Sequence, residues 1–257
     1  MVLASELFDV SNEIVLVTGG GTGLGFGMAR ALAMNGARLA LAGYDPTSLE
    51  AGVEAIAALG GNAIAVPLDV RQDETISSAF DHIETALGPV SVLINNAGIA
   101  HRDKATHISR ETLRSVMAVN VDGALMVAQE AARRMIRDNR GGSIVNISSV
   151  LSELPVRQVI AYGASKAALS QMTRCLALEW AKHGIRVNEI RPGWFETALT
   201  DPFLDGPGAK FMAGQNPTGR LGGEHDLIGA VLLLASKASA YMTGSSITID
   251  GGHSMGR

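Results

Sequence analysis

The amino-acid sequence predicts a single α/β domain built on a doubly wound parallel sheet of seven strands, with helices on both faces. Three observations carry this prediction. Short runs rich in β-branched residues alternate with longer amphipathic stretches along the chain. The strand runs are apolar throughout, which is typical of parallel strands that are covered on both sides. No linker, repeat or low-complexity stretch divides the 257 residues, so we expect one domain over residues 1–257.

The apolar runs and the stretches between them define the elements. Seven segments have strand character: 13–18, 37–43, 62–68, 90–95, 143–148, 185–190 and 245–250. The intervening helical patterns lie near 24–35, 47–59, 73–87, 109–138, 158–183 and 225–236. Because crossovers between parallel strands are right-handed, this alternation winds helices over both faces of the sheet.

Residues 193–223 break the alternation. They are rich in Gly, Pro and aromatic residues and are longer than an ordinary connection. Such an insertion beside the carboxyl end of a strand favours a lid over a linker. We therefore expect a lid at about 193–223.

Composition excludes several classes of partner. The net charge is −4 and no Lys/Arg cluster is present, which disfavours a nucleic-acid-binding domain. A single Cys excludes an internal disulfide and favours a reducing compartment. The first residues lack the pattern of a signal peptide, and no apolar run approaches the roughly 20 residues that span a bilayer. We expect a cytoplasmic protein without a membrane partner.

A glycine-rich turn, TGGGTGLG at 18–25, joins the first strand to the first long helix. It fits G-x-x-x-G-x-G through Gly19, Gly23 and Gly25. Glycines allow a pyrophosphate to approach the helix N-terminus, where free N–H groups and the helix dipole favour an anion. No Gly-Lys-Ser/Thr follows, which excludes the phosphate-binding loop of nucleotide hydrolases. The turn predicts a dinucleotide site.

The segment YGASKAAL at 162–169 places a phenol and an ammonium on one helix face, because positions i and i+4 are neighbours. The small residues between Tyr162 and Lys166 allow a ligand to come close. A free phenol has a pKa of about 10, and a neighbouring cation favours the phenolate. We therefore expect Lys166 to lower the pKa of Tyr162.

Further motifs occur in a fixed order: NNAG at 95–98, Asn120 in AVNVDG, ISS at 147–149, Tyr162 with Lys166, and RPGWFET at 191–197. With the glycine-rich turn, this series resembles the short-chain dehydrogenase/reductase family from about residue 8 to 252. The resemblance implies a Rossmann-type, dinucleotide-binding oxidoreductase domain over residues 1–257. It implies reversible hydride transfer between NAD(H) or NADP(H) and a secondary alcohol or ketone.

The resemblance gives four residues catalytic roles. Tyr162 would be the general acid/base, and the positive nicotinamide of the oxidised cofactor would assist Lys166 in lowering its pKa. Lys166 would also bind the nicotinamide ribose. Ser149, thirteen residues before the tyrosine, would hold the substrate oxygen, whereas Ser148 would serve backbone bonding. Asn120 would hold a water that continues the proton relay; its alternative is a local helix kink.

The resemblance also implies the cofactor contacts. Asn96, Ala97 and Gly98 would contact the cofactor through their backbones, and the segment from Pro192 to Thr197 would bind the carboxamide. Asp69 would meet the adenine amine, or would simply be an exposed strand-end Asp. The full set is Gly19, Thr22, Gly23, Leu24, Gly25, Tyr44, Asp69, Val70, Asn96, Ala97, Gly98, Tyr162, Lys166, Pro192, Gly193, Phe195 and Thr197.

The choice between NAD and NADP depends on the end of the second strand, where the family places an Asp for NAD or a following Arg for NADP. Those positions are Gly43 and Tyr44 here. Asp45 precedes a proline, so we favour a helix N-cap over a ribose contact. Thr22 occupies another position where a cation can serve NADP. We expect a modest preference for NAD, because no cation from these two segments meets the 2′-phosphate.

The substrate is less well defined. RPGWFETALT is similar to the corresponding stretch of gluconate and sugar-alcohol dehydrogenases, which favours a small polyol, sugar acid or hydroxy-ketone. The main alternative is a carrier-linked 3-ketoacyl substrate, for which only Arg102, Lys104 and Arg157 offer a basic patch. Ser149, Leu151, Glu153 and Trp194 are the candidate substrate contacts. The expected pocket also includes His101, Phe203, Phe211 and Met212.

Three expectations remain. The resemblance, together with apolar residues on more than one face of helices 109–138 and 158–183, implies a homotetramer. No H-E-x-x-H or paired ligand spacing is present, so we expect no metal site. Cys175 fits a buried apolar thiol better than a nucleophile.

A catalytically silent nucleotide-binding regulator is the alternative to an enzyme, but this chain keeps Ser149, Tyr162, Lys166 and Asn120.

Overall fold

The protein, described here from a computed structural model, has one parallel sheet of seven strands in the order β3-β2-β1-β4-β5-β6-β7. The structure describes residues 2–196 and 207–255. The strands are β1 (Ile14–Thr18), β2 (Arg38–Gly43), β3 (Asn62–Pro67), β4 (Val92–Asn95), β5 (Gly142–Ile147), β6 (Ile185–Pro192) and β7 (Ser246–Ile249). The strand order reverses between β1 and β4, which defines a doubly wound sheet and confirms the predicted fold class.

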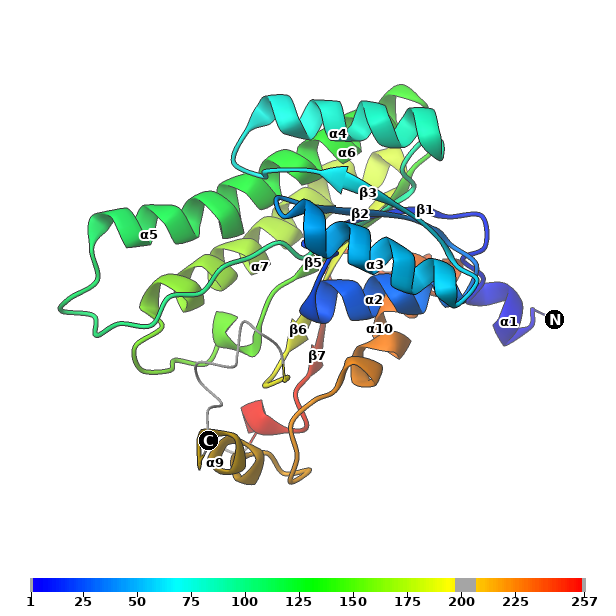
Figure 1. The fold of residues 1–257 in the computed structure, drawn as a ribbon. Helices are drawn as coiled ribbons and strands as arrows, with labels where there is room; N and C mark the ends of the chain where they lie inside the picture. Colours follow the sequence, from blue (N-terminus) through cyan, green and yellow to red (C-terminus); the bar gives the residue numbers. More distant parts are fainter. Residues whose placement is uncertain (1, 197–206, 256–257) are drawn as a thin grey trace.

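Helices cover both faces of the sheet (Figure 1). One face carries α2 (Gly23–Met34), α3 (Pro46–Ala58) and α10 (Ile228–Ala235). The other carries α4 (Asp73–Ala86), α6 (Ala124–Arg137) and α7 (Ile160–Trp180), and α5 (Arg110–Met117) continues the layer beside α7. Shorter elements are α1 (Ala4–Leu7), α9 (Pro207–Gln215) and the turns η1 (Ala118–Gly123), η2 (Val150–Ser152), η3 (Ala181–His183), η4 (Glu224–Leu227), η5 (Lys237–Ser239) and η6 (His253–Met255).

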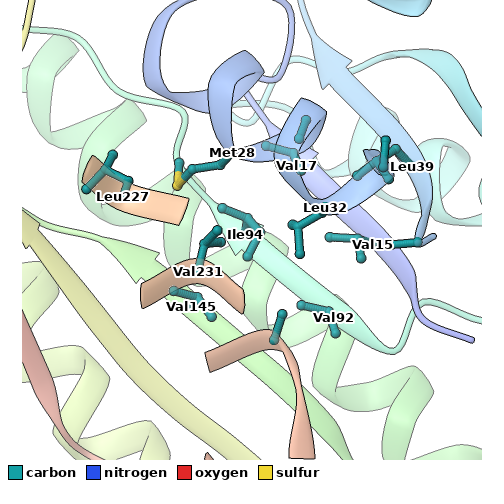
Figure 2. Packing of buried hydrophobic residues seen from close by; sticks show 14 of the residues in the cluster. Val15, Val17, Met28, Leu32, Leu39, Val92, Ile94, Val145, Leu227 and Val231 are labelled. Carbon is teal, nitrogen blue, oxygen red and sulfur yellow. The ribbon is translucent and has the colours of Figure 1, made fainter. Parts of the chain in front are cut away.

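The sheet divides the core into two apolar clusters, because successive strand side chains point to opposite faces. Val15 and Val17 of β1 pack with the α2 and α10 side (Figure 2), whereas Ile14 and Leu16 pack with the α4 and α6 side. All five β1 residues are buried. The continuous apolar strands of the sequence therefore have the two-sided coverage that was predicted.

The predicted helix at 109–138 is three elements. The α-helix α5 passes into the π-helix η1 at residue 118, and α6 begins at residue 124. The predicted helix at 158–183 ends at Trp180 and continues as the 3₁₀ turn η3. The short helices were not predicted, because a turn or two contains too few residues to show a period.

The expected lid lies partly outside the described residues. Within the described part, Phe195 forms a β-bridge with Gly222, and the Gly222 N–H donates to the Trp194 carbonyl at 2.8 Å. These contacts hold the two ends of residues 193–223 together. The role of this segment as a lid remains a prediction.

The expected burial of Cys175 is wrong. Its side chain is exposed, on the outward face of α7 that also presents Gln171 and Leu178. The core positions of the same turn are Thr173 and Leu176. The surrounding sequence is apolar on more than one helix face, so composition alone does not show which face is inward.

Candidate active site

A cleft of about 600 Å³ opens at the carboxyl ends of the central strands, where the strand order reverses. Every predicted cofactor position except Thr197 lines this cleft, and Ser149 lines it too; Thr197 is outside the described residues. The lining residues that sequence reasoning did not assign to the site are Thr18, Ala42, Leu68, Arg71, Ile99, Val119 and Ile147.

The glycine-rich turn shapes one wall of the cleft. Gly19 and Gly23 have φ of +63° and +54°, a conformation that favours glycine. A Cβ on Gly25 would lie 2.2 Å from the Gly19 carbonyl oxygen, so only glycine fits there. Thr22 is the N-cap of α2, and its side chain makes no capping hydrogen bond. The first turn of α2 thus presents backbone N–H groups to the cleft, and a pyrophosphate fits this cradle.

Thr18 organises the opposite side of the turn. Its hydroxyl accepts hydrogen bonds from the backbone N–H groups of Asn96 and Ala97, both at 2.9 Å. The Asn96 side-chain amide donates in return to the Thr18 carbonyl at 3.0 Å. The hydroxyl therefore locks the end of β1 to the end of β4. The Thr that opens TGGGTGLG is the sequence signal for this role.

Tyr162, Lys166 and Ser149 meet in the cleft. Tyr162 and Lys166 lie one turn apart on α7, with the Lys166 nitrogen 5.6 Å from the centroid of the tyrosine ring. The Lys166 ammonium donates to the Ile147 carbonyl at 2.8 Å. Ser149, at the start of η2, accepts from the Leu151 N–H at 3.1 Å, and it lines the same cleft as Tyr162, whose pKa it acts to lower. The three predicted residues are thus brought together.

The expected direction of the Tyr162 pKa is wrong for the protein alone. Desolvation raises the pKa of Tyr162 to about 12, and the Ser149 hydrogen bond lowers it only in part. Desolvation lowers the pKa of Lys166 to about 8, with Glu189 acting in the opposite direction. Lys166 does not lower the tyrosine pKa because its ammonium lies over the ring face and binds Ile147.

Asn120 lies in the π-helix η1 and is fully buried. Its side-chain oxygen accepts from the Ile99 N–H at 2.8 Å, and its amide donates to the Ile99 carbonyl at 2.9 Å. The amide also donates at 3.0 Å to the Ser165 hydroxyl, which itself donates to the Tyr162 carbonyl. The local helix distortion is therefore present, and the amide bridges η1 to α7. Its role in holding a relay water remains a prediction.

The end of the cleft near Tyr44 and Asp69 contains few charged groups. Asp45 is the N-cap of α3 and accepts from the Thr47 and Ser48 N–H groups, which confirms the favoured capping role. Asp69 binds Arg71, with Nη2 and Oδ2 separated by 2.6 Å, and this contact holds the pKa of Asp69 below its usual value. Tyr44 is 85% exposed at the rim.

The candidate substrate residues lie in several places. Leu151 and Glu153 line a second cavity of about 770 Å³, together with Gly163 and Ala167 on the other side of α7. Trp194 is buried and donates to His253 at 3.3 Å. The other residues of the expected pocket are His101 and Phe211, which are exposed, Met212, which is half-buried, and Phe203, which is outside the described residues.

The described residues contain neither a membrane-spanning helix nor a cluster of metal ligands. Within residues 2–196 and 207–255, no helix is long and apolar enough to cross a membrane. Among the same residues, no group of three or more His, Cys, Asp or Glu side chains could hold a metal ion.

The doubly wound sheet, the glycine cradle and the Ser–Tyr–Lys group define a nicotinamide-dependent oxidoreductase. A family model described as enoyl-(acyl carrier protein) reductase matches residues 19–254. The chain belongs to this family, within the short-chain dehydrogenases/reductases that act on CH–OH groups.

Known relatives match over nearly the whole chain. The 5-keto-D-gluconate 5-reductase of Escherichia coli is 34% identical over 96% of this chain and 98% of its own. Galactitol 2-dehydrogenase (L-tagatose-forming) of Cereibacter sphaeroides is 37% identical over 97% and 98%. The crystal structure of a gluconate 5-dehydrogenase from Burkholderia cenocepacia, in complex with NADP and tartrate, superimposes with a TM-score of 0.93. It is 33% identical and covers 98% of this chain and 99% of its own.

Proposed function

We propose that the protein interconverts a secondary hydroxyl and a ketone on a small free polyol or sugar acid. The observation that carries the proposal is the meeting of Ser149, Tyr162 and Lys166 in one cleft that also contains the glycine cradle. The similarity to a ketogluconate reductase and to a galactitol dehydrogenase supports this substrate class.

Each residue of the site would perform one task. The nicotinamide cofactor, when bound, supplies or accepts the hydride. Ser149 holds the substrate oxygen and Tyr162 exchanges a proton with it. Lys166 binds the nicotinamide ribose and places a positive charge near the phenol. Asn120 fixes the backbone of Ile99 against the catalytic helix through Ser165.

A panel of free polyols, sugar acids and hydroxy-ketones, assayed by nicotinamide absorbance, tests the substrate class. We expect turnover of at least one polyol or sugar acid well above simple alcohols. A carrier-linked 3-ketoacyl substrate is the competing outcome. Lys104 and Arg157 line the second cavity, and Arg102 donates to Gln158. Because none of these three basic groups lines the cleft, a free substrate is favoured over a carrier-linked one. Cofactor binding without turnover of any substrate would favour the regulator.

The second proposal is a modest preference for NAD over NADP. Lys166 and Arg71 are the cationic side chains among the described residues that line the cleft, and Arg71 is bound to Asp69. Gly43 and Tyr44 offer no charge to a 2′-phosphate. Gly43 also places no carboxylate against it, so NADP should still be used. The similar gluconate 5-dehydrogenase structure contains NADP, so the activity of this protein with NAD has to be compared directly with its activity with NADP.

The ratio of kcat/KM for the two cofactors, measured with one substrate, tests this preference. We expect a ratio of less than about tenfold in favour of NAD. A strong NADP preference would contradict the proposal and would indicate that Arg71 leaves Asp69 for the phosphate. In that event, Arg71→Gln would reduce kcat/KM for NADP and leave that for NAD nearly unchanged.

We further propose a homotetramer that forms through the helices of the α5–α7 layer. The outward face of α7 presents small and apolar residues at helical spacing: Ala164, Ala167, Cys175 and Leu178. Leu178 is 82% exposed. An apolar stripe on an outer helix is typical of an interaction surface. As a separate point, we also propose that the protein is cytoplasmic, as expected from its sequence.

A further inference from the structure

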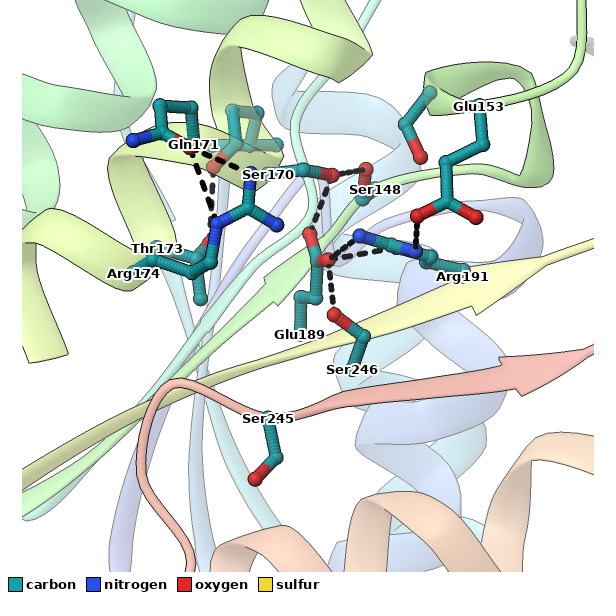
Figure 3. Close-up of polar contacts among 12 residues, drawn as sticks. Ser148, Glu153, Ser170, Gln171, Thr173, Arg174, Glu189, Arg191, Ser245 and Ser246 are labelled. Atoms are coloured by element: carbon teal, nitrogen blue, oxygen red, sulfur yellow. Dashed lines mark hydrogen bonds and ion pairs between the residues drawn. The ribbon is translucent and has the colours of Figure 1, made fainter.

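Glu189 of β6 is a buried carboxylate that lies directly behind the catalytic helix. It is 1% exposed and accepts three hydrogen bonds, and it also forms an ion pair with Arg191. Arg191 Nε donates to Glu189 Oε1 at 2.7 Å, and Arg191 Nη2 lies 2.6 Å from the same oxygen. The Ser170 and Ser246 hydroxyls donate at 2.7 Å and 2.6 Å. Figure 3 shows these contacts converging on one carboxylate.

The contacts of Glu189 continue to the catalytic lysine. Because Ser170 gives its hydroxyl proton to Glu189, the Ser148 hydroxyl donates to Ser170 at 2.9 Å and shares this proton with the backbone carbonyl of Lys166 at 3.2 Å. These serines are buried between α7 and the sheet. The chain of hydrogen bonds therefore joins a charged group on β6 to the turn of α7 that carries Lys166.

Arg191 extends the same network to the serine side of the site. Its side chain is 8% exposed, and its Nη1 forms an ion pair with Glu153. Glu153 is the C-cap of η2, the turn that Ser149 begins. The same turn is also fixed by the Ser152 hydroxyl, which donates to the Ser149 carbonyl at 2.7 Å. Arg191 thus contacts a carboxylate on each side of the catalytic group.

Burying these charges is costly, since each ion loses several kcal/mol of hydration, and well-packed apolar residues often give equal stability. A role in stability alone therefore explains the pair poorly. We propose that Arg191 and Glu189 are positioning residues, which hold the Ser149 turn and the Lys166 turn of α7 in register with each other. This inference rests on the proposed oxidoreductase function, whose catalytic groups it positions.

Electrostatics support the proposal. The charged groups of the network are Glu189 and Arg191 on β6, Glu153 after η2 and Lys166 on α7; the described contact from β7 is the neutral Ser246. Burial lowers the pKa of Lys166, and the Glu189 carboxylate raises it. Glu189 would therefore keep Lys166 protonated at higher pH, besides fixing its backbone.

The test compares Arg191→Met, Glu189→Gln, Ser170→Ala and Arg191→Lys with the unaltered enzyme. All kinetic assays use saturating cofactor and a secondary alcohol that the enzyme turns over. We expect Arg191→Met to lower kcat at least about tenfold, with little change in cofactor Kd. Arg191→Lys should recover part of the loss because it keeps a cation. Ser170→Ala, a small change that leaves the ion pair intact, should lower kcat less. Glu189→Gln should move the alkaline limit of the pH profile to lower pH.

Arg186→Met is the matched control. Arg186 lies on the same strand and is half-buried, but it binds the Leu234 and Ser236 carbonyls instead of carboxylates. We expect this variant to lose thermal stability without a change in kcat or pH profile. If Arg191→Met and Ser170→Ala keep kcat within twofold of the unaltered enzyme, the proposal is overturned.

Hydrogen exchange provides a readout that needs no substrate. Arg191→Met should accelerate amide exchange in residues 149–153 and in the first turns of α7, and Arg186→Met should not. Unchanged exchange in both segments would overturn the positioning role. If the unaltered enzyme turns over no panel substrate, the proposed function fails, and the exchange result alone then decides the positioning role.

Discussion

At the scale of single residues, the site is governed by burial. Desolvation raises the pKa of Tyr162 to about 12 and lowers that of Lys166 to about 8. Both shifts favour the neutral form of the group, because a low-dielectric environment disfavours charge. The protein alone therefore holds a protonated phenol beside a lysine that loses its charge readily.

Tyr162→Phe should abolish turnover while cofactor binding stays nearly intact. The change removes the proton donor and acceptor, but it leaves the ring, Lys166 and the glycine cradle in place. Steady-state kinetics and a cofactor titration measure the two effects. Tyr241→Phe is the control, since Tyr241 is fully exposed. Substantial activity in the Tyr162 variant would refute its assignment as the general acid/base.

The rate of alcohol oxidation should rise with pH. Oxidation needs the phenolate, whose fraction increases about tenfold for each pH unit below the pKa of Tyr162. The rise should weaken above about pH 8, where Lys166 loses its proton. Ketone reduction uses the phenol and should not rise over the same range. Profiles of kcat/KM in both directions check this; an oxidation rate that falls between neutrality and pH 8 would contradict it.

Spacing predicted that Tyr162 and Lys166 share a helix face, and the family resemblance predicted that Ser149 joins them at the site. They did not predict the direction of the tyrosine pKa. That direction depends on how deeply the ring is desolvated and on where the lysine nitrogen points. Neither quantity is visible in a spacing of four residues.

At the scale of elements, the glycine-rich turn is the most constrained connection of the cleft. Gly25→Ala should weaken cofactor binding strongly, because its Cβ would lie 2.2 Å from the Gly19 carbonyl oxygen and 2.5 Å from the Asn96 amide nitrogen. The turn must open to accept the methyl group, which displaces the N-terminus of α2.

Gly229→Ala provides the control for this change. Gly229 lies in α10, and a Cβ there meets nothing within 4 Å. It should therefore leave cofactor Kd unchanged and stabilise the helix slightly. Cofactor titration of both variants, with thermal unfolding, separates binding from folding. Equal cofactor Kd for Gly25→Ala and the unaltered enzyme would show that the turn does not contact the cofactor.

Periodicity predicted the elements well where they are long. All seven strands and the main helices follow from apolar runs and from helical spacing. The π-helix η1 could not be predicted, since one extra residue in a turn changes the period too little to detect. Residues 193–223 have no period, so their sequence predicted a lid but did not predict the helix α9 within them.

At the scale of the whole molecule, the proposed tetramer makes a direct prediction. Light scattering should give a mass about four times the chain's 26.7 kDa at micromolar concentration. Leu178→Glu, which places a charge on the outer face of α7, should reduce that mass. Leu59→Glu is the control, because Leu59 is also exposed but follows α3. A monomer in the unaltered protein would contradict the proposal.

The residues that line the cleft are far apart in the chain, and this spread bears on when the cleft forms during biosynthesis. Thr18 and its partner Asn96 are 78 positions apart in the chain, and the same cleft needs Lys166 and Pro192. A parallel sheet assembles only from such distant contacts, which makes folding slow relative to local structure. A ribosome that has delivered the first half of the chain has therefore delivered the glycine-rich turn and Asn96, but not Lys166 or Pro192. Competence to bind cofactor is acquired late, after β6 has left the exit tunnel, and a truncated chain that ends before β6 has no complete site to be rescued by cofactor.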